Sequence, residues 1–597
     1  MQPEKYYENR LVALKNQLSI YQKRKSTLAW LRFGALGGAI STFLLLLPYG
    51  WEYAAMACLL LIAAFIRLVF FDLKNKTAIE NTIQLIEINQ DELKALAHDY
   101  FHFDEGNEYL PKEHLYAFDL DIFGRASLFQ YANRTTSQLG GATFAKWLLN
   151  PAEATIILQR QTAVKELSAK TEWRQQLMAF GKQKKVLATT QHRLEKWLHE
   201  PNRFINKKYW QRLQFVFPVC MLSILGFNFF DIISDPARNT ALLISGVIAF
   251  FISRKVGPMH SQLAKMSAEL DVLSDSIELI EQVIFKTELL KNLQQQYYQR
   301  QSTASAELYK LKTILERLDM RFNMVVFPVL AILFQWDLLQ AIALEKWKQR
   351  NQQNCIDWME ALANFEALNS LSTLAFNHPK WCLPILKEEQ FFIEGSEIGH
   401  LLIPENKRVN NKICIKAKGQ LMLVTGSNMA GKSTYLRSIG TNVVLAMAGS
   451  FVCAKSFSLS FVQLITSMRI ADNLEENTST FYAELKKLKI VIEKVNRQEK
   501  VFILLDEILR GTNSLDRHTG SAALIKQLIK HEAAAIVATH DIELTKLKEN
   551  YPSNIFNYHF DVQVSSNDEL YFDYQLKEGV CNSLNASILM KKIGIEM

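Results

Sequence analysis

The residues Gly426 to Ser433 have the types and the spacing that bind phosphate groups. They read Gly-Ser-Asn-Met-Ala-Gly-Lys-Ser, follow the apolar run Leu421–Val424 and lead into a helical pattern from Thr434 to Met447. This order of strand, glycine-rich loop and helix directs backbone N–H groups at phosphate oxygens. Lys432 would reach the β- and γ-phosphates, and the Ser433 hydroxyl would ligate Mg²⁺. A chance match in an ordinary turn is the alternative, and the flanking pattern favours a nucleotide site.

Two carboxylates follow a second apolar run, Val501–Leu505. In nucleotidases with a phosphate loop, an aspartate in the position of Asp506 holds Mg²⁺ through water. A glutamate in the position of Glu507 polarises the attacking water. The alternative is surface charge at a strand end, but the preceding apolar residues indicate a buried central strand.

A third apolar run, Ala533–Ala538, ends at Thr539 and His540. Parallel strands that end beside a phosphate loop bring the residues after them to one sheet edge, where ligands bind. His540 is therefore predicted to sense the γ-phosphate, although a lone histidine is more often a capping or core residue. The predicted catalytic residues are Lys432, Glu507 and His540.

The composition of the whole chain limits what surrounds this site. Its 597 residues are too many for one core and predict several structural units. A net charge of +8 permits an anionic partner, either nucleic acid or acidic lipid headgroups, without choosing between them. The seven cysteines include no CxxC pair, which argues against a disulfide framework or a zinc site and fits a reducing compartment.

Two apolar spans near the N-terminus predict a membrane hairpin. The first, from Phe33 to Trp51, has no charged residue, and the second, from Tyr53 to Phe71, has only Arg67. Spans of this length cross an apolar layer of about 30 Å. Basic residues before and after the pair place both of its ends on the cytoplasmic side. A buried hairpin in a soluble domain is the alternative.

A second hairpin is predicted at 213–230 and 240–253, with basic residues again at both ends and the turn Asp231–Arg238 between the spans. The shorter apolar run Met324–Phe334 is interpreted as a buried core helix. Apolar residues repeat with 3,4 spacing from Leu263 to Ile284, which predicts a coiled-coil seam on a long helical arm. The segment Glu360–Phe376 is predicted to be another buried helix.

Five ordered segments resemble the motifs of the MutS mismatch-repair ATPases, and the wider similarity covers about 119–200 and 355–597. Within the first of these ranges, Leu128–Pro151 is similar to the start of that family's helical core domain. The five segments are Gly426–Thr434, Asp472–Leu474, Ser479–Glu484, Asp506–Thr512 and Ala538–His540.

The resemblance implies a homodimer that uses ATP and Mg²⁺, with Ser479 approaching the γ-phosphate bound by the partner. It implies that Ser433 and Asp506 bind Mg²⁺. The residues that it places around the nucleotide are Gly426, Ser427, Asn428, Met429, Ala430, Gly431, Lys432, Ser433 and Thr434.

Several positions depart from the family pattern. Ser427 and Ala430 stand where the family has Pro and Gly, Leu509 replaces a Gly, and Ser583–Ala586 replaces a Ser-Tyr-Gly run. No stretch resembles the mismatch-reading domain or the DNA-clamp insertion. The string Tyr6-Tyr7-Glu8 is only superficially like the family's Phe-x-Glu wedge.

The expected architecture is an α/β P-loop ATPase domain behind a mainly α-helical core or lever domain that carries transmembrane hairpins. The expected boundaries are 1–80 for the first hairpin, 81–384 for the lever domain and 385–597 for the ATPase domain. We expect a multi-pass protein of the cytoplasmic membrane, with the ATPase domain in the cytoplasm. The leading hypothesis is an ATP-driven dimeric clamp on DNA. The alternative is a membrane-tethered ATP switch that acts on a protein or membrane partner.

Overall fold

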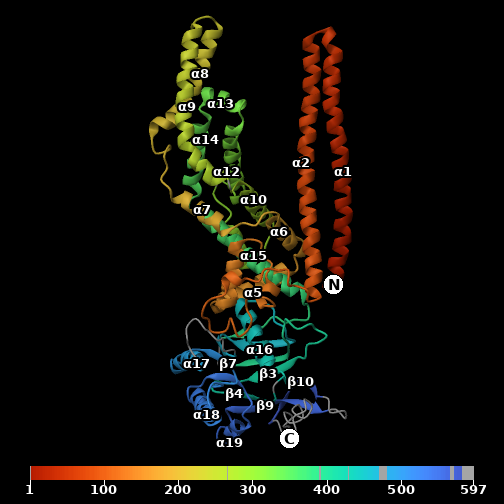
Figure 1. Ribbon diagram of the computed structural model, residues 1–597, viewed down its shortest axis with the longest axis vertical. Helices are drawn as coiled ribbons and strands as arrows, with labels where there is room; N and C mark the ends of the chain where they lie inside the picture. The colour runs from red at the N-terminus through yellow and green to blue at the C-terminus, as the bar shows by residue number, and fades with distance from the viewer. Residues whose placement is uncertain are drawn as a thin grey trace.

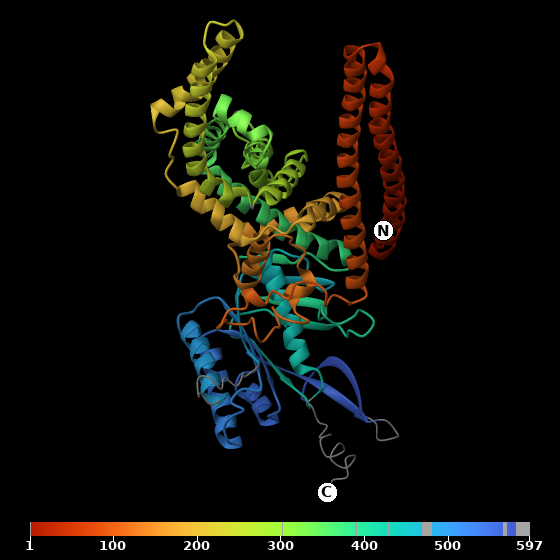
Figure 2. The same cartoon turned by 45° about the horizontal axis from the view of Figure 1, so that its top comes forward.

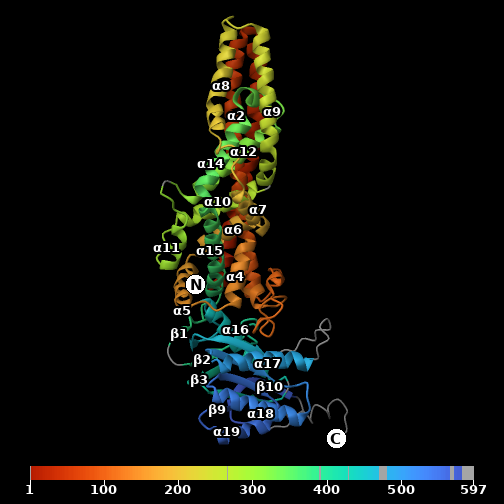
Figure 3. The ribbon, with the colours of Figure 1, turned by 90° about the vertical axis from the view of Figure 1, so that its left-hand side faces the viewer.

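The computed structural model describes residues 2–264, 266–300, 302–388, 391–427, 429–468, 480–564 and 570–580. The molecule is elongated, with a sheet-containing domain at one end and two helical arms that extend from a helical domain at the other (Figure 1). A side view shows that both arms point away from the sheet domain (Figure 3). The chain is thus mostly helical in its N-terminal part and has its mixed sheets in its C-terminal part.

The first arm is the hairpin of α1 (Pro3–Leu46) and α2 (Trp51–Leu96), joined by the turn η1 (Leu47–Tyr49). Both helices extend well below their apolar spans. At the lower edge of those spans, Arg32 forms an ion pair with Asp72 at 3.0 Å. Above this pair the apolar side chains are mostly exposed, because only the facing helix covers them.

The second arm is the hairpin of α8 (Lys208–Phe229) and α9 (Asp235–Ala264). In Figure 2 it stands apart from the first arm, with the green helices of the chain beside it. Among the described residues, α1, α2, α8 and α9 are the four single helices long and apolar enough to cross a membrane.

The apolar run Met324–Phe334 is not the buried core helix that its composition predicted. Residues 326–334 form α13 (Val326–Phe334), in which only Ala331 is buried. Met324 is 93% exposed and Val325 80% exposed. The prediction was wrong because a short apolar run shows only that a segment avoids water, and here it packs on the second arm instead of in the core.

The predicted coiled-coil seam is divided between two helices. Its apolar residues up to Ile280 are buried, but α9 ends at Ala264, α10 begins at Ser267 and Ile284 is 86% exposed. The seam therefore packs within the helical domain, where α10 lies against α12. The other helices of this domain are α3 (Leu128–Ala132), α4 (Gln138–Leu149), α5 (Ala154–Ser168), α6 (Thr171–Gln183), α7 (Ala188–His199), α10 (Ser267–Glu281), α11 (Glu288–Gln295), α12 (Ala304–Asp319), α14 (Trp336–Asn351) and α15 (Asn354–Asn377).

Helix α15 is the central element of the helical domain. It confirms the buried helix predicted over Glu360–Phe376, and most of its side chains are buried around its whole circumference. It packs against α4, α5, α6, α10 and α11. Its last turn leads through His378 directly into the sheet domain.

The sheet domain holds a six-stranded and a four-stranded sheet, in the orders β10-β9-β4-β8-β7-β6 and β1-β5-β2-β3. The three predicted strands at 421–424, 501–505 and 533–538 are confirmed as the buried strands β4, β7 and β8, all parallel. The strands are β1 (Ile385–Lys387), β2 (Ile393–Ile398), β3 (Asn411–Ile415), β4 (Leu421–Thr425), β5 (Ser456–Ser460), β6 (Gln463–Ser467), β7 (Val501–Asp506), β8 (Ala534–Thr539), β9 (Ile555–Val564) and β10 (Leu570–Glu578). The helices of this domain are α16 (Lys432–Ala448), α17 (Thr480–Asn496), α18 (Ser514–Lys530) and α19 (Leu547–Asn550).

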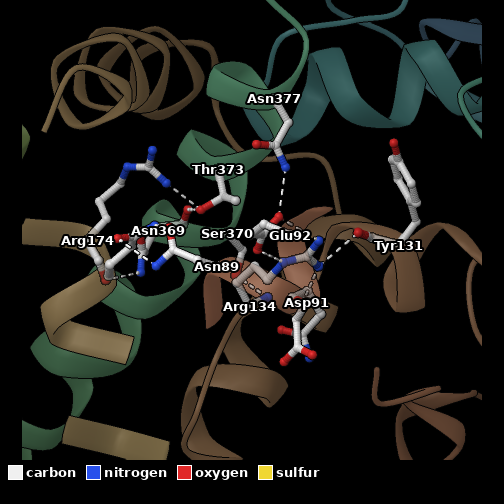
Figure 4. A network of polar contacts seen from close by, with 12 residues as sticks. Asn89, Asp91, Glu92, Tyr131, Arg134, Arg174, Asn369, Ser370, Thr373 and Asn377 are labelled. Atoms are coloured by element: carbon white, nitrogen blue, oxygen red, sulfur yellow. Dashed lines mark hydrogen bonds and ion pairs between the residues drawn. The ribbon is translucent and has the colours of Figure 1, made fainter. Parts of the chain in front are cut away.

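A buried polar network joins the base of the first arm to the end of α15 (Figure 4). The Glu92 carboxylate on α2 accepts hydrogen bonds from Arg134 Nε at 2.5 Å and from Asn377 Nδ2 at 2.8 Å. Tyr7 of α1 donates its hydroxyl proton to Asn377 Oδ1 at 2.7 Å. Arg134 N also donates to Ser370 Oγ of α15. Both helices of the arm are thereby attached to the helix that leads into the sheet domain.

We expect Glu92→Ala to destabilise the helical domain by about 3–5 kcal/mol, because it leaves the buried Arg134 guanidinium without its counter-charge. The apparent Tm of the intact protein, followed by scanning fluorimetry, measures this loss. The control is Glu87→Ala, which removes an exposed carboxylate from the same helix and should change stability by no more than about 0.5 kcal/mol. Equal Tm values for the two variants would show that the network is not an anchor.

Candidate nucleotide site

The phosphate loop begins where β4 ends, in the middle of the six-stranded sheet. Gly426 has φ 146°, and a Cβ at this position would lie 2.8 Å from the Phe560 carbonyl oxygen of the neighbouring strand. Gly431 has φ 106° and precedes the first residue of α16. The loop is therefore closed by two glycines that other residues could not replace without strain. Of the predicted loop residues Gly426 to Thr434, only Asn428 lies outside the described residues.

The Lys432 ammonium lies on the inner side of this loop. Its Nζ donates hydrogen bonds to the carbonyl oxygens of Gly426 at 2.8 Å and Ser427 at 3.0 Å. The side chain is buried, so its charge is little screened by water. Together with the first N–H groups of α16, it makes the loop a site for anions.

The first carboxylate of the predicted pair faces the start of α16. Burial raises the pKa of Asp506, and a hydrogen bond from the Ser433 side chain opposes that shift. The Oδ1 atom of Asp506 is buried and has no hydrogen-bond partner among the described residues. A hydroxyl and a carboxylate are the hard oxygen ligands that Mg²⁺ prefers, with phosphate oxygens and water completing its shell. Ser433 and Asp506 thus fit the magnesium site predicted for them.

The second carboxylate contacts the predicted histidine. Glu507 Oε1 forms an ion pair with His540 Nε2, and Glu507 Oε2 forms another with Arg510 Nη2 at 2.9 Å. The hydrogen bond from His540 is the largest cause that lowers the pKa of Glu507. His540 Nε2 also lies 3.3 Å from Lys432 Nζ. The ends of β7 and β8 and the start of α16 therefore bring all three predicted catalytic residues together, and Glu507 stays ionised.

A residue with no role assigned from the sequence holds the segment after this carboxylate. Glu484 of α17 is 3% exposed, and its carboxylate accepts hydrogen bonds from the backbone N–H groups of Leu509 and Arg510. Burial raises its pKa. It belongs to the motif Ser479–Glu484, and that membership was the one signal in the sequence that could have identified it.

The structure accommodates Leu509 at the position where the resembled family has glycine. Leu509 has φ 60° and Glu507 has φ 48°, a left-handed backbone that costs about 1–3 kcal/mol for each residue that is not glycine. Gly520 of α18 leaves room for the Leu509 side chain, since a Cβ there would lie 2.5 Å from Leu509 Cδ1. Glu484 therefore stabilises a strained turn whose shape aims Glu507 at the loop.

An open cleft of about 400 Å³ adjoins these residues and is lined by Glu507, Arg510, His518 and His540, among others. His518 Nδ1 lies 2.6 Å from Asp541 Oδ2 on its wall. The predicted residue Ser479 and the segment Asp472–Leu474 lie outside the described residues, as does Ser583–Ala586. Among the described residues no cluster of three or more His, Cys, Asp or Glu side chains could hold a metal ion by itself.

We expect Glu484→Ala to lower the kcat of nucleotide hydrolysis by roughly 10–100-fold while KM changes little, because the Glu507 turn loses its support while the loop stays intact. Steady-state kinetics separates the two parameters. Glu484→Gln, which keeps an oxygen acceptor, should retain most of the activity. Glu493→Ala, on an exposed position of the same helix, is the control. A parallel rise of KM in Glu484→Ala would assign Glu484 to nucleotide binding instead.

Comparison with known proteins agrees with this geometry. Residues 422–592 match the family model described as MutS domain V. The DNA mismatch repair protein MutS of Thermotoga maritima is 31% identical over 209 residues, which cover 34% of this chain and 26% of that protein. MutS protein homolog 4 of Mus musculus is 34% identical over 189 residues, 31% of this chain and 19% of the relative. The mitochondrial DNA mismatch repair protein mutS homolog of Sarcophyton glaucum is 33% identical over 217 residues, 35% of this chain and 21% of the relative.

The chain spans about a quarter or less of the length of these relatives. The matched family model contains the phosphate loop from Gly426 onward, the carboxylate pair and His540, all placed at one sheet edge. The C-terminal part of this chain therefore matches MutS domain V, and over this part the chain is similar to proteins of the MutS family.

Proposed function

We propose that the protein is a Mg²⁺-dependent ATPase of the MutS type that works as a dimeric switch at a membrane. The observation that carries the catalytic part is the meeting of Lys432, Glu507 and His540 beside the phosphate loop. Such an arrangement neutralises phosphate charge on one side and holds an ionised base on the other.

Each residue has a distinct role in this proposal. Lys432 and the N–H groups of the loop bind the β- and γ-phosphates, and Ser433 and Asp506 hold Mg²⁺, which neutralises developing charge on the phosphates when it is bound. Glu507 orients the attacking water and accepts its proton. His540 keeps Glu507 ionised and faces the γ-phosphate, while Ser479 of the partner completes the site.

The membrane part rests on the two arms. Four helices that are long and apolar enough to cross a membrane extend in one direction, away from the nucleotide site. Their apolar parts are only 6–22% buried, so a bilayer is the partner that their surface fits. A surface that grips DNA would instead need lysine and arginine against the phosphates. We therefore propose that the ATP cycle acts on a membrane or on a protein within it.

DNA is the second candidate ligand, favoured by the names of the relatives and by the net charge of +8. ATPase rates measured with duplex, mismatched and branched DNA, and with lipid vesicles alone, decide between the two ligands. Salt-dependent binding and stimulation by one DNA structure would make the switch a DNA clamp. If DNA binding is absent at about 50 mM salt with both ATP and ADP, the DNA candidate fails.

We expect Glu507→Gln to bind ATP but to lose hydrolysis by roughly 10²-fold or more, because the amide cannot accept the proton of the attacking water. Lys432→Ala should lose ATP binding itself. Glu549→Gln, at an exposed position on α19 outside the cleft, is the control for a lost carboxylate. Turnover by Glu507→Gln at the rate of the unmodified protein would exclude Glu507 as the base.

Glu507→Gln also tests whether ATP drives dimer formation. With hydrolysis blocked, ATP should accumulate a dimer that light scattering detects. Adding Ser479→Arg should abolish that dimer, since the longer charged side chain cannot enter the partner's site. A double variant that still dimerises with ATP would refute the composite site.

For the membrane anchor, we expect a cysteine at Ser234, in the turn of the second arm, to react with an impermeant maleimide in intact spheroplasts. The background lacks the native cysteines. Ser553→Cys, exposed on the sheet domain, should react only after lysis. Reaction of both cysteines only after lysis would place the second arm in the same compartment as the ATPase domain.

A further inference from the structure

Helix α13 carries an exposed apolar surface that neither the ATPase cycle nor the four long helices explain. Its sequence, Val-Phe-Pro-Val-Leu-Ala-Ile-Leu-Phe, contains no polar residue. Val329 is 55% exposed, and the preceding residues Phe322, Met324 and Val325 are 74–93% exposed. The helix has nine residues, so it is about 14 Å long and cannot cross a hydrocarbon layer of about 30 Å.

The position of α13 is fixed by the second arm. It packs against α8 and α9, and Figure 1 shows it beside the middle of that hairpin. Ile332 of α13 packs against α9 at Gly246, where a Cβ would lie 3.8 Å from the Ile332 side chain, an ordinary van der Waals distance. Arg321, before α13, contacts α9 at Ser253, and Gln335, after α13, contacts α9 at Ser245. Ser245 lies about 12 Å further along α9, towards the tip of the second arm. The exposed face of α13 therefore continues the exposed apolar face of α9.

At each end of α13, side chains of the protein bind some of the backbone groups. At its start, Asn323 Oδ1 accepts hydrogen bonds from the N–H groups of Val325 at 3.1 Å and Val326 at 3.0 Å. At its end, the Ser245 hydroxyl donates to the Ile332 carbonyl, and Gln335 Nε2 donates to Ser245 O at 3.2 Å. A helix that ends in water does not need such partners, whereas one that ends in lipid must have them.

Charged groups gather at the level where α13 begins and the chain leaves it. Arg321 Nη2 donates to Ser253 O at 3.0 Å and lies 3.3 Å from Asp337 Oδ2, the second residue of α14. Lys255 lies close by on α9, with its ammonium 6.0 Å from the Trp210 ring centroid. This belt of cations and an indole is typical of a membrane–water interface. A bend of 74° between α13 and α14 returns the chain to it.

We propose that α13 is a re-entrant membrane segment, which enters the cytoplasmic leaflet beside α9 and leaves on the same side. This rests on the membrane anchor proposed above and adds a third membrane element to the chain. The occupant of its exposed face is lipid hydrocarbon, since the face is continuous with that of the hairpin and its ends are capped within the protein. Helix α14 follows α13 and is buried in the helical domain, so a displacement of α13 by lipid would be transmitted directly to that domain.

The test uses single cysteines in the full chain, without the native cysteines, in membrane vesicles with the cytoplasmic face outward. Val326→Cys and Val329→Cys, at positions 38% and 55% exposed, report on α13. Leu243→Cys, at a position 69% exposed on α9, is the reference for a residue inside the membrane span. Tyr309→Cys, at a position 62% exposed on α12, is the reference for a residue in water. The α13 and α9 cysteines should react with an impermeant maleimide at least about tenfold more slowly than Tyr309→Cys, because hydrocarbon suppresses the thiolate that reacts.

The outcomes separate this proposal from the anchor on which it rests. If Leu243→Cys is protected while both α13 cysteines react as fast as Tyr309→Cys, the re-entrant segment is refuted and the anchor stands. If Leu243→Cys also reacts fast, the anchor itself fails. A bimane attached at Val329→Cys must in addition be quenched by brominated acyl chains. Protection without quenching would mean that protein covers α13, and it would overturn the proposal.

Discussion

The buried carboxylate of Glu92 is the constraint on which the arrangement of the domains depends. A charge taken out of water must keep its partners, because losing one costs several kcal/mol. Arg134 and Asn377 therefore hold α2 and the end of α15 in one position. His378 follows at once, 4.1 Å from the Trp381 ring, and burial lowers its pKa to about 3, so that it is neutral at physiological pH. The first arm and the sheet domain thus share one rigid junction.

A second connection runs from the helical domain to the nucleotide site itself. Asp119, which precedes α3, is buried and accepts hydrogen bonds from Thr466 Oγ1 of β6 at 2.6 Å and from Lys487 Nζ of α17 at 3.2 Å. The same helix α17 carries Glu484, which supports the turn after the carboxylate pair. One helix therefore contacts both the catalytic turn and the segment that enters the helical domain. Such an element is suited to transmit a change at the site, because packed elements shift between discrete positions.

The two arms differ in how they meet the rest of the molecule. The first arm is bound at its base by the polar network around Glu92, while the second is continuous with the helical domain through α9 and α14. An ion pair lies at the lower edge of the apolar part of each arm: Arg32 with Asp72 on the first arm, and Arg321 with Asp337 beside the second. Arg32 and Asp72 are partly exposed, as fits a pair at the edge of an apolar layer, whereas Asp337 is buried and Arg321 keeps its charge paired inside the protein.

The sequence by itself determined which residues meet at the candidate nucleotide site. The loop, the pair Asp506–Glu507 and His540 could be predicted because each follows an apolar strand, and parallel strands bring such residues to one edge. The sequence did not predict the hydrogen bond from the Leu509 N–H group to Glu484. The two residues are 25 positions apart in the sequence, and only the packing of α17 brings them together. For α13 the composition predicted burial, whereas the fold places the helix against α8 and α9 with only Ala331 buried. Hydrophobicity reports only that a segment avoids water, whereas neighbouring elements determine whether protein or lipid replaces that water.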